Sequence, residues 1–182
     1  MNRYIAFLRA INVGGRFVKM AALRRQFEPP TFTDVQTYIQ SGNVFFTSPL
    51  RDSAELEHQI EGRLGQALEF EVPAFVRTAA TMFDLADYWP FREAEPESDS
   101  AYYVSFLKET PAAEERRKLL LLSSELDEFH VYNRHVFWRW RRPLGPSEMT
   151  NSGLERLLDI TATRRNLNTV RKVVEKYLLT DG

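Results

Sequence analysis

One order of predicted elements occurs twice along this chain, and this repeat constrains the fold more than any other feature. Apolar spacing predicts strand, helix, strand and strand at 4–8, 20–27, 35–40 and 43–47, and again at 101–107, 110–122, 128–132 and 136–141. Positions 38 and 131 are equivalent in the two sets, as are positions 45 and 138, and each pair is 93 residues apart. The residues themselves are not similar, so the sequence predicts two copies of one architecture.

The first half contains two more predicted helices and a fourth strand. Leucine and isoleucine recur every four residues over 56–68, which is typical of an amphipathic helix. A β-rich run follows at 72–77, and a short helical stripe then ends at Pro90, because proline cannot continue a helix. The predicted order of the first half is therefore βαββαβ with one added helix.

The best candidate for a linker is the stretch 93–100, which is acidic, contains serine and Pro96, and has no apolar period. It separates an N-terminal half at 1–92 from a C-terminal half at 101–182. The C-terminal half ends differently from the first, with a short helix to about Asp159 and a last helix that begins near Asn166. We therefore expect an α+β protein of two halves with antiparallel sheets and an extra C-terminal helix.

Composition excludes several classes of protein. The chain has 182 residues, is 43% hydrophobic and carries a net charge of -1, which is typical of a soluble globular protein and not of a surface that binds nucleic acid everywhere. Cysteine is absent, which excludes disulfides, thiol catalysis and cysteine-ligated zinc. Because no targeting or membrane segment is recognisable, we expect a cytoplasmic protein.

No metal or cofactor is expected from the residues. His58, His130 and His135 show no spacing that is typical of a metal site. Of the 24 basic residues only five are lysine, and arginine suits phosphate and carboxylate recognition. A GC-rich coding sequence produces the same excess of arginine, so the count alone decides nothing.

Two polar segments with glycine follow predicted strands in the first half. The segment 9–15 contains Arg9, Asn12, Gly14 and Gly15, and the segment 40–43 contains Gln40, Ser41 and Asn43 around Gly42. Backbone N–H groups of a glycine turn, together with arginine and amide side chains, are suited to holding an anion. A simple turn and a hairpin are the alternative interpretation, because glycine and asparagine accept left-handed backbone geometry.

The third polar segment lies where the last helix is predicted to begin. It contains Thr163, Arg165, Asn166 and Asn168. The first N–H groups of a helix lack partners within the helix and attract negative charge, so polar side chains gathered there are typical of a phosphate or carboxylate site. Helix capping by Thr163 or Asn166 is the alternative and accounts for one or two of these residues.

The chain resembles the DUF1697 family of uncharacterised bacterial proteins. The resemblance depends on the segment from Phe7 to Gly15, on Met20 and Leu23, on Thr37 to Val44, and on the C-terminal segment from Thr163 to Val170. It implies two tandem ferredoxin-like halves, which agrees with the element order above, and it implies no activity. This chain departs from the family pattern at Glu148, where a lysine is usual.

We expect an anionic, phosphate-bearing ligand or nucleotide to bind between the two halves. The candidate ligand-binding residues are Arg9, Asn12, Gly14, Gly15, Gln40, Ser41, Asn43, Thr163, Arg165, Asn166 and Asn168.

Two other functions stay open. The aromatic and arginine-rich strand 135–142 is suited to stacking single-stranded nucleic acid; the alternative is that its tryptophans are core residues and its arginines cover a solvent face. A hydrolase or transferase that uses Ser41 or Asn43 is the third hypothesis, and the sequence does not indicate the oligomeric state.

Overall fold

The computed structural model describes the chain with the exception of residues 10, 12–17, 28, 39–41, 93–95 and 179–182. The chain divides into two compact units. The first contains Met1–Leu85 together with Val173–Gly182, and the second contains Ala86–Lys172. The predicted boundaries at 1–92, 93–100 and 101–182 stay a prediction.

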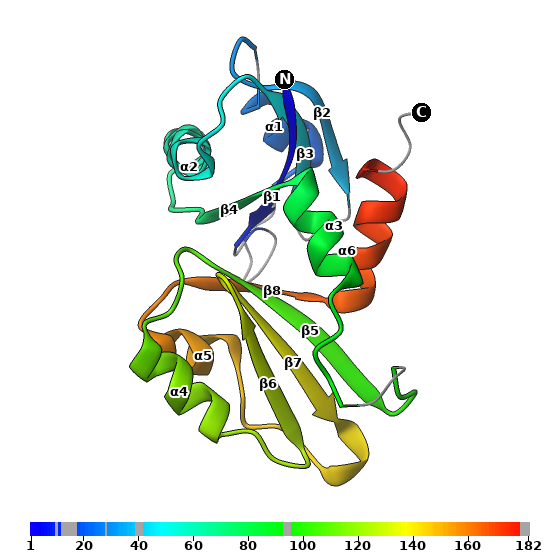
Figure 1. Cartoon of the computed structure of the whole chain (residues 1–182). Helices are drawn as coiled ribbons and strands as arrows, with labels where there is room; N and C mark the ends of the chain where they lie inside the picture. The colour runs from blue at the N-terminus through cyan, green and yellow to red at the C-terminus, as the bar shows by residue number, and fades with distance from the viewer. Residues whose placement is uncertain (10, 12–17, 28, 39–41, 93–95, 179–182) are drawn as a thin grey trace. The chain divides into compact units, whose positions relative to one another are not determined.

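The first unit is built on a four-stranded antiparallel sheet with the strand order β2-β3-β1-β4 (Figure 1). Its elements in chain order are β1 (Asn2–Leu8), α1 (Met20–Arg25), β2 (Thr33–Tyr38), β3 (Asn43–Ser48), α2 (Ser53–Leu68), β4 (Ala74–Thr78) and α3 (Ala79–Asp87), whose last two residues belong to the second unit. This order is the ferredoxin-like arrangement of a βαββαβ chain.

The core of the first unit lies between one face of the sheet and the helices α1 and α2. Leu56, Ile60 and Leu64 are fully buried against residues of the sheet such as Phe46, as their four-residue spacing predicts. The helix α2 begins after Asp52, whose carboxylate accepts a hydrogen bond of 2.8 Å from the backbone N–H of Ala54. These contacts place α2 across the sheet.

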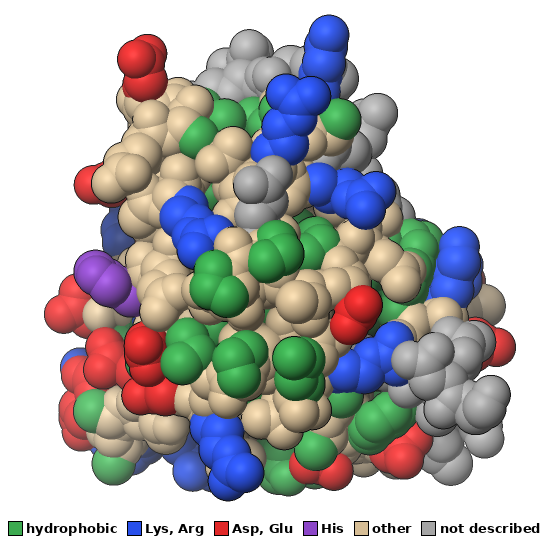
Figure 2. All heavy atoms as spheres, turned by 90° about the horizontal axis from the view of Figure 1, so that it is seen from above, with side chains coloured by type: hydrophobic (Ala, Val, Ile, Leu, Met, Phe, Trp, Pro, Cys, Tyr) green, Lys and Arg blue, Asp and Glu red, His purple; other side chains and the backbone are tan. Residues whose placement is uncertain are grey.

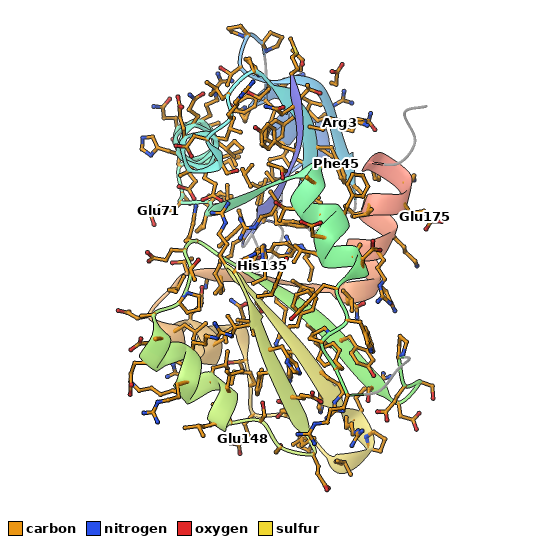
Figure 3. All side chains as sticks on the ribbon, in the orientation of Figure 1. Arg3, Phe45, Glu71, His135, Glu148 and Glu175 are labelled. Carbon is orange, nitrogen blue, oxygen red and sulfur yellow. The ribbon has the colours of Figure 1, made fainter. Side chains whose placement is uncertain are left out.

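The opposite face of this sheet is contacted by the end of the chain. The segment Val174–Leu178 is a π-helical continuation of the last α-helix, and its Tyr177 stacks on Phe45 of β3 with ring centroids 4.2 Å apart. Figure 3 labels Phe45 and shows it on β3 beside this helical segment. The C-terminal residues are therefore part of the packing of the first unit.

The second unit repeats the same topology, with the antiparallel strand order β6-β7-β5-β8 (Figure 1). Its elements are β5 (Ser100–Leu107), α4 (Ala113–Leu121), β6 (Asp127–Tyr132), β7 (His135–Arg141), the 3-10 turn η1 (Arg142–Leu144), α5 (Asn151–Leu158), β8 (Ala162–Asn166) and α6 (Leu167–Val173). The predicted α+β class, with two ferredoxin-like sheets and a C-terminal helix, is confirmed.

The core of the second unit lies under α4 and α5. Leu119 of α4 and Leu154 of α5 are buried against Phe129 and Trp138 of the sheet. The ring nitrogen of Trp138 donates a hydrogen bond of 2.7 Å to Asp127. A large apolar side chain with a satisfied polar atom is suited to such a core.

The strand β8 is the one element of the second sheet that the sequence did not predict. Its residues Thr163, Arg164 and Arg165 are polar, so no apolar alternation marks them as a strand. Pairing with the buried strand β5 nevertheless places them in the sheet. The last helix begins at Leu167, close to the predicted start.

Candidate functional site

The structure describes six of the eleven predicted ligand residues. Arg9 and Asn43 lie in the first unit, and Thr163, Arg165, Asn166 and Asn168 lie in the second. The other five, Asn12, Gly14, Gly15, Gln40 and Ser41, lie outside the described residues.

The described part of the two glycine segments supports the hairpin geometry that the sequence predicted. Gly42 has a φ of +77°, and a Cβ atom there would lie 3.1 Å from Cβ of Leu8. Its carbonyl accepts a hydrogen bond of 2.8 Å from the backbone of Leu8. Asn43 is fully buried, and its side chain donates to the carbonyl of Tyr38 at 3.0 Å. Glycine and asparagine therefore have structural reasons to be at 42 and 43.

The predicted residues of the second unit divide into two pairs. Arg165 donates to the hydroxyl of Thr163 and to the carbonyl of Arg164, each at 2.9 Å. Burial lowers the pKa of Arg165 to about 10, because desolvation disfavours the charged guanidinium. Asn166 accepts a hydrogen bond of 2.8 Å from the backbone of Asn168, and both side chains are exposed.

Asn166 and Asn168 line a groove of about 470 Å³ in the second unit, which we call the aromatic groove. It lies where β5 begins and where β7 and β8 end. Its lining residues are Trp89, Pro96, Glu97, Ser98, Ser100, Ala101, Tyr102, Tyr103, Trp140, Arg142, Asn166, Leu167, Asn168 and Arg171. Thr163 and Arg165 are not among them, so the groove brings together only part of the predicted set.

Aromatic rings form much of the wall of the aromatic groove. Trp89 and Tyr102 lie with their ring centroids 4.9 Å apart. Trp140 is partly exposed, and its ring nitrogen donates a hydrogen bond of 3.0 Å to the carbonyl of Gly145. Such rings offer flat apolar surfaces whose orientation is already set.

Two guanidinium groups complete the aromatic groove, and backbone carbonyls hold both of them. Arg142 donates to the carbonyls of Asp99 at 3.2 Å and Ser98 at 3.0 Å. Arg171 donates to the carbonyl of Ala86 at 3.2 Å and lies 5.4 Å from the ring centroid of Trp89. Within the described part of the chain, neither arginine has a carboxylate at ion-pair distance. Backbone carbonyls therefore orient their positive charges, and no described carboxylate pairs with them.

A second cavity of about 460 Å³ lies in the same unit, and we call it the arginine cavity. Its lining residues are Arg92, Ser123, Ser124, Glu125, Glu128, Arg139 and Arg141. Glu128 forms an ion pair of 3.0 Å with Arg139, and its other oxygen lies 2.7 Å from Nε2 of His130. Only Arg139 and Arg141 belong to a segment that the sequence marked as a candidate, because the other lining residues come from separate segments and form no motif.

The ion pair between Arg141 and Glu97 joins the arginine cavity to the aromatic groove. Nε and Nη2 of Arg141 donate to the two carboxylate oxygens of Glu97 at 3.1 and 3.2 Å, and Ser100 donates to Glu97 at 2.8 Å. Arg141 lines the cavity and Glu97 lines the groove. The hydrogen bonds from Arg141 and Ser100 hold the pKa of Glu97 below its ordinary value.

The strand 135–142 presents only part of its aromatic side chains to solvent, because Trp140 is partly exposed and Trp138 is buried. Trp138 is 5% exposed, and the guanidinium of Arg164 covers its ring at 4.6 Å from the centroid. The alternative interpretation placed the arginines of this strand on a solvent face. For Arg139 that is wrong, because its side chain is buried and pairs with Glu128.

Two other features are absent from the described residues, a metal centre and a membrane-spanning helix. No group of three or more histidine, aspartate or glutamate side chains is placed to hold a metal ion there. No helix in that part of the chain has the length and apolar character needed to span a membrane. On the face that Figure 2 presents, basic and acidic side chains are interspersed and form no continuous basic surface.

The fold defines an α+β protein of two tandem ferredoxin-like units, the second of which contains a groove lined by aromatic and arginine side chains. The chain belongs to the family described as "Protein of unknown function (DUF1697)", which matches residues 1–137. It is similar to the solved structure of the conserved bacterial protein SP0830 from Streptococcus pneumoniae, with 21% identity and a TM-score of 0.70 over 97% of this chain and 99% of that chain. At this identity the likeness shows the fold alone. No curated protein matches the chain.

Proposed function

We propose that this protein binds a phosphate-bearing ligand with an aromatic ring, such as a nucleotide, in the aromatic groove. One observation carries the proposal: Arg142 and Arg171 are held by backbone carbonyls beside the rings of Trp89 and Trp140. A guanidinium that pairs with a carboxylate is already neutralised, whereas one that donates only to carbonyls keeps its full charge for an anion.

The two kinds of lining residue suit the two parts of such a ligand. A phosphate group accepts paired hydrogen bonds from a guanidinium, which is the geometry that arginine provides. An aromatic base stacks on exposed tryptophan or tyrosine faces, a contact worth about 1–3 kcal/mol per base. Asn166 and Asn168 add amide groups, which both donate and accept hydrogen bonds and therefore orient a ligand.

The other predicted ligand residues lie outside the aromatic groove or outside the second unit. Thr163 and Arg165 are assigned to supporting β8, since they bond to each other and do not line the aromatic groove. The segments with Arg9, Asn12, Gly14, Gly15, Gln40, Ser41 and Asn43 stay a second candidate region for the same class of anion. Catalysis is not part of this proposal.

Calorimetric titration with adenosine monophosphate and with inorganic phosphate tests the proposal. We expect the nucleotide to bind, and Arg142→Ala and Arg171→Ala each to weaken it by about tenfold, which is the loss of one charge-assisted contact. The matched control is Arg156→Ala, which removes an exposed arginine on α5 outside the groove and should change affinity by less than about twofold. Absence of nucleotide binding, or equal effects of all three substitutions, would refute the proposal.

A further inference from the structure

The ion pair between Glu97 and Arg141 has the geometry of a bound anion. Both carboxylate oxygens of Glu97 accept from the same guanidinium, at 3.1 Å from Nε and 3.2 Å from Nη2. A phosphate group forms the same paired contact with arginine. Glu97 therefore occupies the position on Arg141 that a phosphate oxygen pair would take.

This ion pair is weakly held compared with others in the same unit. The side chains of Arg141 and Glu97 are 31% and 38% exposed, whereas those of Arg139 and Glu128 are 4% and 8% exposed. Exposed pairs change an equilibrium constant by at most about fivefold, because water screens them and ordering the side chains costs entropy. An incoming anion can thus replace Glu97 at small cost.

The arginine cavity gains positive charge when Glu97 leaves. Its lining contains three guanidinium groups, on Arg92, Arg139 and Arg141, and two carboxylates, on Glu125 and Glu128. Glu97 is the additional carboxylate that brings this set to neutrality. Without Glu97 the described lining residues have an excess positive charge and two serine hydroxyls, which suits an anion.

We propose that the arginine cavity is a second phosphate subsite, and that Glu97 blocks it until the ligand's phosphate displaces Glu97 from Arg141. This rests on the proposed binding of a nucleotide in the aromatic groove, and it deepens that proposal by naming the ligand class. Arg142 lines the groove and Arg141 lines the cavity, so a ligand whose ring lies in the groove reaches both arginines with a chain of phosphate groups. The structure thereby assigns a nucleoside polyphosphate as the preferred ligand.

Calorimetry with adenosine mono- and triphosphate, on wild type and on Glu97→Gln, tests this inference. We expect Glu97→Gln to tighten triphosphate binding by about fivefold, since the competing charge is lost, and to change monophosphate binding by less than about twofold. Arg141→Ala should weaken the triphosphate selectively. The matched control is Asp99→Asn, which removes an exposed charge two residues away and keeps the carbonyl that Arg142 contacts.

The outcomes separate this inference from the proposed function. If monophosphate binds through Arg142 and Arg171 but Glu97→Gln does not selectively tighten the triphosphate, the inference is overturned and the proposed function stands. If Asp99→Asn has the same effect as Glu97→Gln, general charge explains the result and the inference is also overturned. If neither nucleotide binds wild type or Glu97→Gln, both fail.

Should Glu97→Gln fold poorly, Ser100→Ala removes one hydrogen bond to Glu97 and should shift triphosphate affinity in the same direction.

Discussion

Single carboxylates of this protein serve several partners at once. In the first unit Glu57 is 4% exposed, pairs with the buried Arg77 at 3.5 Å, and accepts a hydrogen bond of 2.8 Å from the backbone of Val76. It thereby joins α2 to β4. In the second unit Glu97 accepts from Arg141 and from Ser100, but at an exposed position. The same kind of ion pair is thus buried in the first unit and partly exposed in the second.

At the residue scale, the lowered pKa of Glu97 predicts how the free energy of unfolding depends on pH. Its pKa is lowered from 4.5, first by the hydrogen bond from Arg141 and then by that from Ser100. A carboxylate with a lowered pKa in the folded state stabilises the protein above its ordinary pKa, and this contribution is lost as pH falls through the lowered value. We expect wild type to exceed Glu97→Gln in free energy of unfolding by less than about 1 kcal/mol near neutral pH, because the pair is partly exposed.

Urea titrations of the two proteins at a series of pH values measure that difference. It should shrink towards zero as the pH falls below about 4.5. Asp99→Asn, at an exposed neighbouring carboxylate, serves as control for a general charge effect. A difference between wild type and Glu97→Gln that is unchanged at acid pH would contradict the prediction.

At the scale of elements, the last helix changes character within its length. It begins as α6 in the second unit and ends as the π-helical segment Val174–Leu178 in the first. A π-helical turn rotates the side chains that follow it relative to a regular α-helix. Here Tyr177 contacts both Phe45 and Tyr38, whose centroids lie 4.2 and 5.2 Å from its own.

We expect Tyr177→Ala to lower the free energy of unfolding by about 2 kcal/mol, since it loses a partly buried ring and a stacked aromatic contact. Tyr177→Phe keeps the ring and should cost less than about 0.5 kcal/mol. Urea-induced unfolding followed by circular dichroism measures both. Equal losses for the two variants would show that the hydroxyl, and not the stacked ring, matters.

Helix α2 and strand β8 show which elements the local sequence pattern predicts and which it does not. The four-residue spacing of Leu56, Ile60 and Leu64 predicted the buried face of α2, because burial on a helix recurs with its turn. The strand β8 was missed, because Thr163, Arg164 and Arg165 become strand residues only through pairing with β5. Pairing between distant segments leaves no trace in local periodicity.

At the scale of the whole molecule, the chain passes from the first unit to the second within α3 and returns within the last helix. Both units have the same strand order, while their buried residues differ. The net charge of the whole chain is -1, and the face in Figure 2 carries both basic and acidic side chains. Both features disfavour nonspecific binding of nucleic acid, because such binding depends on accumulated positive charge.

We expect single-stranded RNA to bind more weakly than about 100 µM at physiological salt, which is the weak end of nonspecific binding. Arg139→Ala combined with Arg141→Ala should change it by less than about twofold, because Arg139 is buried with Glu128 and one partly exposed arginine adds little to nonspecific binding. Fluorescence anisotropy with a labelled oligonucleotide measures this affinity across salt concentrations. Tight, salt-sensitive binding that the double substitution abolishes would instead favour the nucleic-acid hypothesis.

By itself, the sequence determined the α+β class, the repeat of one topology and the turn at Gly42, because periodicity and backbone geometry are local properties. It also marked Asn166 and Asn168 as candidate ligand residues. Only the tertiary structure brought Arg142 and Arg171 beside Trp89 and Trp140, and Glu97 onto Arg141. These residues come from separate segments, and the distances between them depend on how the strands pair and the helices pack.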